Sequence, residues 1–306
     1  MPSMDVVFTQ ILVIMLYAAI GLAAGKIGLI SAEQRKYLTK LCTSLILPFT
    51  ILSGSSQSIS LQEMATLGAM CLLVLCLFLL TTVISLFIQS RRKTPQPLKV
   101  TTASLLTYPN CTFLGLPLCR ALFGDIALLY NAVALVAFNV LFFTWQFTMF
   151  TGKRFSFRNL LTAPTVSTFA LIVMLLFRLH FPEPVQTVVT SVGAMITPLS
   201  LIIIGVMMSE NRITAILKEK RAYLITLLRN LLIPLAVMLI LHFVPIDAEG
   251  KLCLLVYLAC PCATLTTIYA IQNDVAPEFA ARSVLMSTLF FAASLPLMIF
   301  LGTRLL

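Results

Sequence analysis

Charged residues are scarce in this sequence. Only 10% of its 306 residues are Asp, Glu, Lys or Arg, whereas 59% are hydrophobic; a soluble domain has roughly a quarter charged residues. This balance excludes a soluble enzyme and a nucleic-acid-binding domain, although the net charge of +10 alone would suggest one. About ten membrane helices of 20–25 residues would fill the chain. The sequence therefore predicts an all-α integral membrane protein.

Acidic side chains and histidines are especially rare. The chain has 11 acidic residues and two histidines, and no acidic residue falls deep within an apolar stretch. An intramembrane enzyme would need buried catalytic groups, such as paired aspartates or a zinc-binding histidine cluster. A cation pump would need carboxylates inside the membrane. We therefore expect no enzymatic activity, no metal site and no cofactor, and an anion as cargo.

The eight cysteines also lack a pattern that would give them a role. All lie within apolar stretches, and their spacing fits neither a disulfide framework nor a metal site. Cysteine in such surroundings behaves as a small apolar residue. We expect buried free thiols.

Apolar runs, separated by charged or turn-rich breaks, predict the helices and their orientation. The ten predicted helices span 6–25, 38–54, 64–89, 100–122, 126–150, 160–180, 187–208, 222–244, 251–272 and 279–303. Lys and Arg gather in alternate connections, at 26–40, 91–99, 153–158 and 212–221. By the positive-inside rule these connections are cytoplasmic. We expect a multi-pass protein of the cell membrane, surrounded by the lipid bilayer, with both termini outside.

Segments half a chain apart carry matching patterns. Leu-Ile-Leu-Pro-Phe-Thr-Ile-Leu at 45–52 corresponds to Met-Ile-Thr-Pro-Leu-Ser-Leu-Ile at 195–202, an offset of 150 residues. Further matches follow in the same order. Weak internal similarity of this kind is typical of transporters built from repeats. The sequence predicts two five-helix repeats, 1–152 and 153–306, the second inverted because each holds an odd number of helices.

The strongest match lies where two predicted helices contain proline. Lys99 stands ten residues before Pro109, and Lys251 stands ten residues before Pro261. At about 1.5 Å per residue, each proline lies roughly 15 Å from its lysine, near the middle of the membrane. Proline removes a backbone donor and breaks a helix. We expect two broken helices that cross at these prolines.

The predicted crossing has the chemistry of an anion site. Because proline suits the first position of a helix, Pro109 and Pro261 are expected to begin two second half-helices. Each N-terminal end carries roughly half a positive charge. With Asn110, Thr112 and Thr264, two such ends would bind a carboxylate without a fixed cation.

Three further polar residues have two open interpretations each. Arg229 lies about 12 Å into the predicted helix 222–244 by helical rise. It could extend to the cytoplasmic face or reach inward and attract the anion. Asn139 and Ser287 could line a cavity or form hydrogen bonds between helices.

Several of these segments resemble one known family. Tyr-Pro-Asn-Cys-Thr-Phe-Leu-Gly-Leu-Pro-Leu at 108–118, followed by Phe-Gly-Asp at 123–125, resembles the fourth-helix motif of the auxin efflux carriers, the PIN-like membrane transporters. Pro198–Gly205 is similar to the seventh-helix signature of that family. Cys260-Pro-Cys262 falls where its ninth helix crosses over. The resemblance covers essentially the whole chain.

The resemblance implies a fold and a site. Ten helices would form two inverted repeats in an NhaA-like arrangement, with broken helices 4 and 9 crossing. Helices 1, 2, 6 and 7 would form a scaffold that makes a homodimer, and helices 3–5 and 8–10 a transport domain. The expected substrate-binding residues are Pro109, Asn110, Cys111, Thr112, Asn139, Arg229, Pro261, Cys262 and Thr264.

The sequence therefore predicts a secondary transporter that moves a small organic anion by alternating access. Family members carry carboxylates such as indole acetate, malate or malonate, and the cargo is expected at the crossing. A membrane-embedded sensor that binds the same ligand without moving it is the alternative, because a binding site alone does not establish transport.

Overall fold

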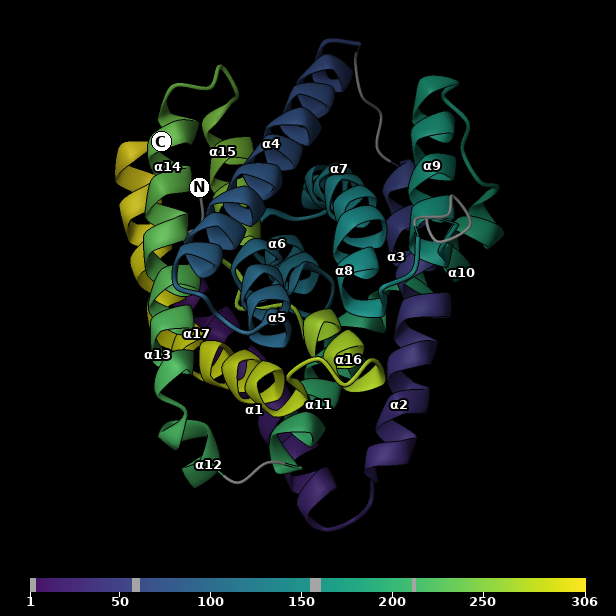
Figure 1. Ribbon diagram of the computed structural model, residues 1–306. Helices are drawn as coiled ribbons and strands as arrows, with labels where there is room; N and C mark the ends of the chain where they lie inside the picture. Colours follow the sequence, from purple (N-terminus) through teal and green to yellow (C-terminus); the bar gives the residue numbers. More distant parts are fainter. Residues whose placement is uncertain (1–3, 57–60, 155–160, 211–212) are drawn as a thin grey trace.

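The computed structural model describes residues 4–56, 61–154, 161–210 and 213–306, and most of these residues are helical (Figure 1). Arg158 and Arg212, two of the basic residues used to predict orientation, lie outside the described residues. In chain order the elements are α1 (Met4–Lys26), α2 (Ala32–Leu41), η1 (Cys42–Ile46), α3 (Leu47–Leu52), η2 (Ser53–Ser56), α4 (Leu61–Arg91), α5 (Gln96–Thr107), η3 (Cys111–Gly115), α6 (Leu116–Phe123), α7 (Ile126–Leu141), η4 (Phe142–Gln146), α8 (Phe147–Thr151), α9 (Ala163–Leu176), α10 (Glu183–Ala194), α11 (Ile196–Ser209), α12 (Ile213–Lys218), α13 (Lys220–Leu227), η6 (Leu228–Leu232), α14 (Ile233–His242), α15 (Ala248–Ala259), α16 (Thr264–Gln272) and α17 (Pro277–Leu305).

Seven segments among the described residues are long and apolar enough to cross a membrane. They are Asp5–Lys26, Ala32–Ser56, Thr66–Arg91, Ile126–Thr151, Glu183–Ser209, Lys220–His242 and Pro277–Leu305. Of the three other predicted helices, α9 has only 14 residues, and 100–122 and 251–272 are each divided by a break. The all-helical membrane class is confirmed, and the count of ten spans stays a prediction.

The second predicted helix begins earlier than expected, at Ala32 and not at 38. Ser31 caps it: its hydroxyl accepts a hydrogen bond from the Gln34 N–H, and the Gln34 side chain accepts one from the Ser31 N–H. This reciprocal capping box satisfies two backbone donors that the helix leaves free. The polar first turn therefore belongs to the helix, although it interrupts the apolar pattern.

Prolines distort several helices without ending them. Three π-turns, η1, η3 and η6, are each followed two residues after their last residue by a proline, at Pro48, Pro117 and Pro234. A proline ring clashes with the carbonyl four residues back, and a π-turn accommodates it by widening the helix locally. Pro48 thus follows a π-turn at the start of α3, and Pro198 lies in the first turn of α11.

Glycines bring α1 and α11 into backbone contact. A Cβ atom added at Gly21 would lie 2.1 Å from the Ile202 carbonyl oxygen, and one at Gly205 would lie 2.0 Å from the Ala18 carbonyl oxygen. Only glycine fits at both places. Small residues permit such close helix packing inside membranes, where the hydrophobic effect does not drive helices together.

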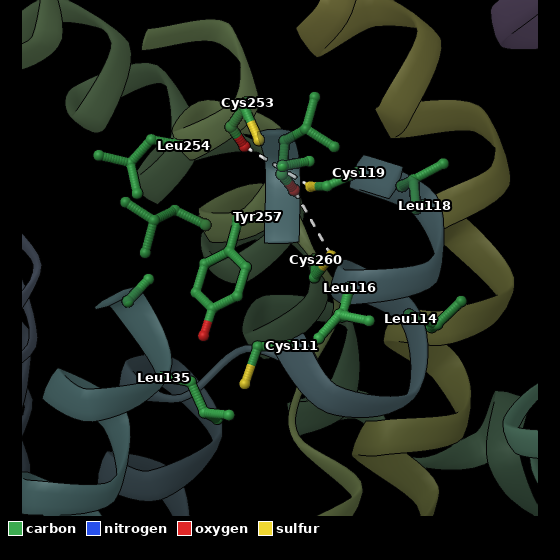
Figure 2. Packing of buried hydrophobic residues seen from close by; sticks show 14 of the residues in the cluster. Cys111, Leu114, Leu116, Leu118, Cys119, Leu135, Cys253, Leu254, Tyr257 and Cys260 are labelled. Atoms are coloured by element: carbon green, nitrogen blue, oxygen red, sulfur yellow. Dashed lines mark hydrogen bonds between the residues drawn. The ribbon is translucent and has the colours of Figure 1, made fainter. Parts of the chain in front are cut away.

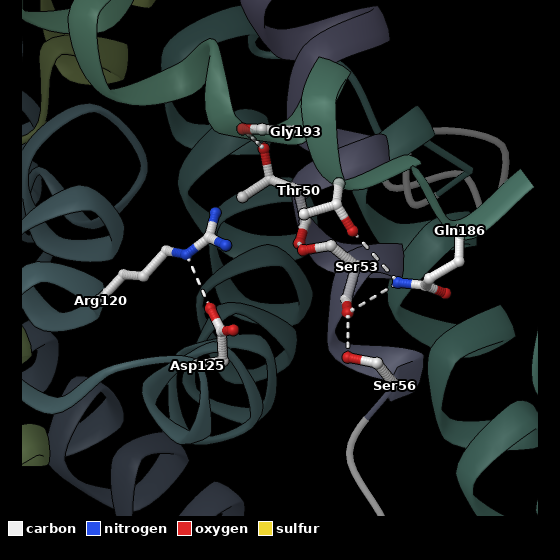
Figure 3. A network of polar contacts seen from close by, with 8 residues as sticks. Thr50, Ser53, Ser56, Arg120, Asp125, Gln186 and Gly193 are labelled. Atoms are coloured by element: carbon white, nitrogen blue, oxygen red, sulfur yellow. Dashed lines mark hydrogen bonds and ion pairs between the residues drawn. The ribbon is translucent and has the colours of Figure 1, made fainter. Parts of the chain in front are cut away.

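A similar close contact joins α3 to α10 (Figure 3). A Cβ atom at Gly193 would lie 2.9 Å from the Thr50 Cα atom, and the Thr50 hydroxyl donates to the Gly193 carbonyl oxygen at 2.8 Å. Figure 3 also shows Arg120 paired with Asp125 at 2.9 Å across the α6–α7 turn. These contacts fix the helices around the broken pair.

Five of the eight cysteines lie in the core near the broken helices. Figure 2 shows part of this cluster, where the Cys119 thiol donates to the Cys253 carbonyl oxygen at 3.7 Å. All eight cysteines are free thiols and six are buried. The prediction is wrong for Cys76, which is exposed on α4 beside the exposed Leu72 and Leu80. Apolar neighbours in the sequence are found both on an exposed helix face and in the core, so they do not predict burial.

Candidate functional site

The two breaks in the helices meet and are hydrogen-bonded to each other. Pro109 and Cys262 form an isolated antiparallel bridge. The Asn110 N–H donates to the Pro261 carbonyl oxygen at 2.7 Å, and the Ala263 N–H donates to the Tyr108 carbonyl oxygen at 3.0 Å. The breaks predicted at the two prolines are therefore confirmed, and α5–α6 crosses α15–α16 at this bridge.

The prolines do not begin the second half-helices, so that prediction is wrong. Helical geometry resumes at Cys111 in one chain segment and at Thr264 in the other. A residue before proline is driven toward extended backbone, and Tyr108 (φ −99°, ψ 120°) and Cys260 (φ −54°, ψ 150°) are both extended. Each proline therefore lies in a short extended linker.

Proline fits this bridge for a definite reason. In an antiparallel bridge of this kind the N–H of Pro109 would point away from its partner, so nothing is lost there. Pro261 lacks the N–H that would otherwise donate to the Asn110 carbonyl oxygen. That oxygen instead accepts hydrogen bonds from Leu114 and Gly115, at 3.1 and 3.0 Å, which close the first turn of η3.

Polar side chains join the two helices on both sides of the bridge. The Asn110 amide, 3% exposed, donates to the Thr264 hydroxyl at 3.1 Å. The hydroxyls of Ser104 and Thr266 lie 2.8 Å apart. Buried hydroxyls and amides in a membrane need such partners. Asn110 is thus fixed toward the start of α16.

A cavity of about 560 Å³ connects this crossing to the basic end of α2. Its inner part is formed by Asn110, Thr112 and the first residues of η3, and its outer part by α2. The lining residues on α2 and η1 are Arg35, Lys36, Thr39, Lys40, Thr43 and Ser44. Among the described residues that line it, none is acidic.

The electrostatics of the cavity favour negative charge. Helices Cys111–Phe123 and Thr264–Gln272 both begin at it, and the first N–H groups of a helix have no partner within the helix. At the outer end Arg35 pairs with Glu210 at 2.6 Å. Among the described residues, Lys36 and Lys40 form no ion pair. Two uncompensated cations therefore stand at one end and two positive helix ends at the other.

Aromatic rings form one wall of the cavity and support the crossing. The Tyr108 ring lies 5.1 Å from that of Phe138 and 5.0 Å from that of Phe142, edge to face. Phe142 contacts Tyr269 of α16 at 5.3 Å. Phe138 and Tyr269 line the cavity together with Phe143. Such pairs contribute about 0.5–1.5 kcal/mol each beyond their area burial.

Two other cavities offer less to an anion. One, of about 240 Å³, lies between α1, α11 and α17, and its described lining residues are apolar except for Thr288. The other, near His180, contains Glu183 and lies along the N-terminal part of α10. Among the described residues, the first reaches Leu114 of η3 but no residue of the bridge, and the second contains no residue of the broken helices.

The predicted site residues divide into three groups. Pro109, Asn110, Cys111, Thr112 and Asn139 line the cavity, and the Asn139 amide nitrogen is buried there without a hydrogen-bond partner.

The second group, Pro261, Cys262 and Thr264, lies at the bridge, but these side chains do not line the cavity. The Cys262 N–H donates to the Ser287 hydroxyl at 3.1 Å. Ser287 thus forms a bond between helices, one of its two expected roles.

Arg229 is the third case. It reaches inward, one of its two expected directions, and its attraction of an anion stays a prediction. The side chain is 1% exposed, so it does not extend to the surface. It donates to three backbone carbonyl oxygens, those of Leu106, Leu258 and Cys260, at 3.2, 2.6 and 3.2 Å. These lie at the C-terminal ends of α5 and α15, so the guanidinium does not line the cavity either.

The lysines of α2 are the site residues that the sequence interpretation missed. The sequence prediction uses Lys36 and Lys40 only for orientation, within the basic connection 26–40, yet with Ser44 they are spaced four residues apart. That spacing places all three on one helix face, and all three line the cavity. A basic stripe on a helix next to an apolar segment was the available signal.

Comparison with known proteins identifies the family. A family model described as membrane transport protein matches the chain in two segments, residues 6–159 and 153–299. No individual curated protein matches it. The family is one of transporters and not of enzymes, and the resemblance seen in the sequence is confirmed. The chain belongs to the membrane transport protein family, that of the auxin efflux carriers.

Proposed function

We propose that this protein is a secondary transporter that carries a small organic anion with a carboxylate group by alternating access. The observation that carries the proposal is the cavity joining Lys36 and Lys40 to Asn110 and the first turn of η3. At its inner end the groups offered are mainly donors, namely backbone N–H groups, an amide and a hydroxyl. Positive helix ends bind anions without a fixed cation.

Each part of the cavity has a role in this proposal. The carboxylate binds at the start of Cys111–Phe123, where the amides of Asn110 and Asn139 add donors. The aromatic wall contacts the body of the cargo. Lys36 and Lys40 raise the local concentration of anions at the entrance. By the positive-inside rule this entrance is cytoplasmic.

The proposal extends to the arrangement of the helices. We propose two inverted repeats, 1–152 and 153–306, with the crossing in a transport domain and α1 and α11 in a scaffold that dimerises. The backbone contact at Gly21 and Gly205 makes α1 and α11 a rigid pair, against which the crossing would move.

A ligand screen followed by flux tests the function. Purified protein is heated with acetate, malonate, malate or indole acetate, and a bound ligand at 100 times its Kd stabilises by about 2.7 kcal/mol. Carboxylates that raise the melting temperature are then tested for uptake into liposomes. Saturable uptake supports transport, and stabilisation without uptake identifies a sensor. If no carboxylate stabilises the protein while amines do, the proposal is wrong.

Orientation is tested by labelling single cysteines in a variant without native thiols. Reagent added outside the cell should modify cysteines placed at Ser56 and Asp247, and should leave one at Thr94 unmodified. Strong labelling at Thr94 would place the cavity entrance outside.

A further inference from the structure

Arg229 occupies a place that the proposed mechanism does not use. It lies in the π-turn η6, which spans Leu228–Leu232. The neighbouring Asn230 amide donates to the Ser287 carbonyl oxygen at 2.7 Å, and Ser287 in turn accepts from the Cys262 N–H. The turn is thereby tied to α17 and to the crossing. π-turns inside α-helices are frequent at functional sites.

The three carbonyl groups that Arg229 contacts belong to two different helices. Leu106 is in the last turn of α5, and Leu258 is in the last turn of α15, with Cys260 just beyond it. The last four carbonyls of a helix have no partner within it, and together they carry about half a negative charge. The planar guanidinium, with five donors, satisfies both ends at once.

The charge of Arg229 has no carboxylate beside it. Among the described residues, Arg229 forms no ion pair. A buried charge must be compensated, and here two converging helix C-termini compensate it. The guanidinium and the two helix ends are therefore one electrostatic unit.

In cation-driven carriers, the C-terminal ends of half-helices and unwound carbonyls coordinate the coupling cation. We propose that Arg229 is a positioning residue that serves as a built-in cation at this place. It holds the two first half-helices together, and it removes the need for soluble Na⁺ or K⁺ there. The part of this inference that concerns cargo rests on the proposed function, whereas the placement of the cation does not.

The test compares two long polar replacements that differ in charge, Arg229→Lys and Arg229→Gln. Asn230→Ala, in the same turn, is the matched control, because it removes a buried hydrogen bond but no charge. Each purified protein is melted in choline chloride, sodium chloride or millimolar guanidinium chloride. No cargo is needed for this measurement, so its result is independent of the ligand screen.

The Gln variant should melt at least about 5 °C below the wild type in choline. Guanidinium or Na⁺ should restore much of this loss in a saturable way. The wild type, the Lys variant and Asn230→Ala should show no such response. Folded Gln variant that is recovered only when these cations are present would show that the charge is required. The same conclusion follows if no folded Gln variant is recovered while the Lys variant is recovered. Equal melting of the Gln and Lys variants without a cation response would overturn the inference. Loss of both variants, with Asn230→Ala recovered, would overturn it too.

Where the screen finds a transported carboxylate, uptake gives a second readout. Wild-type uptake of that carboxylate should be equal in Na⁺ and choline media, and uptake by the Gln variant should become dependent on Na⁺ or guanidinium. A wild type that needs Na⁺ would contradict the inference. If no carboxylate is transported, the proposed function fails, and the melting experiment still decides the role of Arg229.

Discussion

The two sides of the crossing treat the ends of the broken helices in opposite ways. On one side, Cys111–Phe123 and Thr264–Gln272 begin at a cavity, which residues of both first turns line. On the other side, the carbonyls that end α5 and α15 are taken up by Arg229 inside the protein. The helix ends on one side (the open side) border a cavity, and those on the other side (the closed side) are bound by a side chain.

This difference shows how a protein can make a selective site from broken helices. A break leaves donors on one side and acceptors on the other, and both are costly inside a membrane. When these acceptors are satisfied permanently, the groups left at the cavity are mainly donors, which under the proposed function would favour negative charge. In that case the preference for anions would depend on the carbonyl groups that Arg229 occupies as much as on the residues that line the cavity.

Reversing the charge on the closed side should have the largest effect. Arg229→Glu would place a carboxylate against two negative helix ends, and breaking a buried ionic arrangement costs about 3–5 kcal/mol. We expect almost no folded protein in the membrane, measured by size-exclusion chromatography of detergent extracts. Asn230→Ala should be recovered well. A normal yield of the Glu variant would show that the closed side does not depend on the guanidinium.

The same kind of change on the open side should leave folding intact. Thr112 is partly exposed in the cavity near the start of η3, and an acidic residue there is stabilised by the helix end by about 0.3–1 kcal/mol. Thr112→Asp should therefore melt near the wild type but weaken binding of carboxylates by at least about 100-fold, because like charges repel. Thr112→Asn is the uncharged control. Unchanged affinity in the Asp variant would place the anion elsewhere.

The bond between the two helices at the open side should have an intermediate effect. Asn110→Ala leaves the Thr264 hydroxyl without its donor and removes an amide from the cavity, which should weaken binding by about 1–3 kcal/mol. Thr264→Ala should weaken it less, and the double variant should show non-additivity, since the two side chains are in contact. Wild-type uptake by Asn110→Ala at all cargo concentrations would make Asn110 structural.

The entrance lysines should have the smallest effect. Replacing Lys36 and Lys40 by Gln should lower uptake about two- to five-fold at low salt and hardly at all above about 0.5 M salt, because screening removes long-range attraction. Replacing Lys218 and Lys220 by Gln, outside the cavity lining, is the control. A salt-independent loss would mean that the lysines contact the cargo directly.

Sequence patterns could predict the breaks but not what surrounds them. The spacing of Lys99 and Pro109, and of Lys251 and Pro261, located both breaks because proline acts on its own backbone. The extended residues Tyr108 and Cys260 could also have been expected, from the restriction on residues before proline. These are local effects, and they can be read without knowledge of the tertiary fold.

The role of Arg229 depends on contacts between distant segments, so the sequence could not reveal it. Its partners Leu106 and Cys260 are 123 and 31 residues away and contribute backbone atoms, which leave no trace in residue identity. The exposure of Cys76 has a similar origin, because an apolar helix in a membrane does not indicate which face is turned outward. The two inverted repeats stay a prediction.

The bridge between Pro109 and Cys262 has a mechanical consequence. It holds only two hydrogen bonds, and the prolines supply no further donor with which the linkers could pair in another register. A sliding movement of one helix along the other would leave the N–H groups of Asn110 and Ala263 without acceptors in apolar surroundings, at several kcal/mol each. The bridge therefore fixes the alignment of the two broken helices, and we expect them to move together as one body.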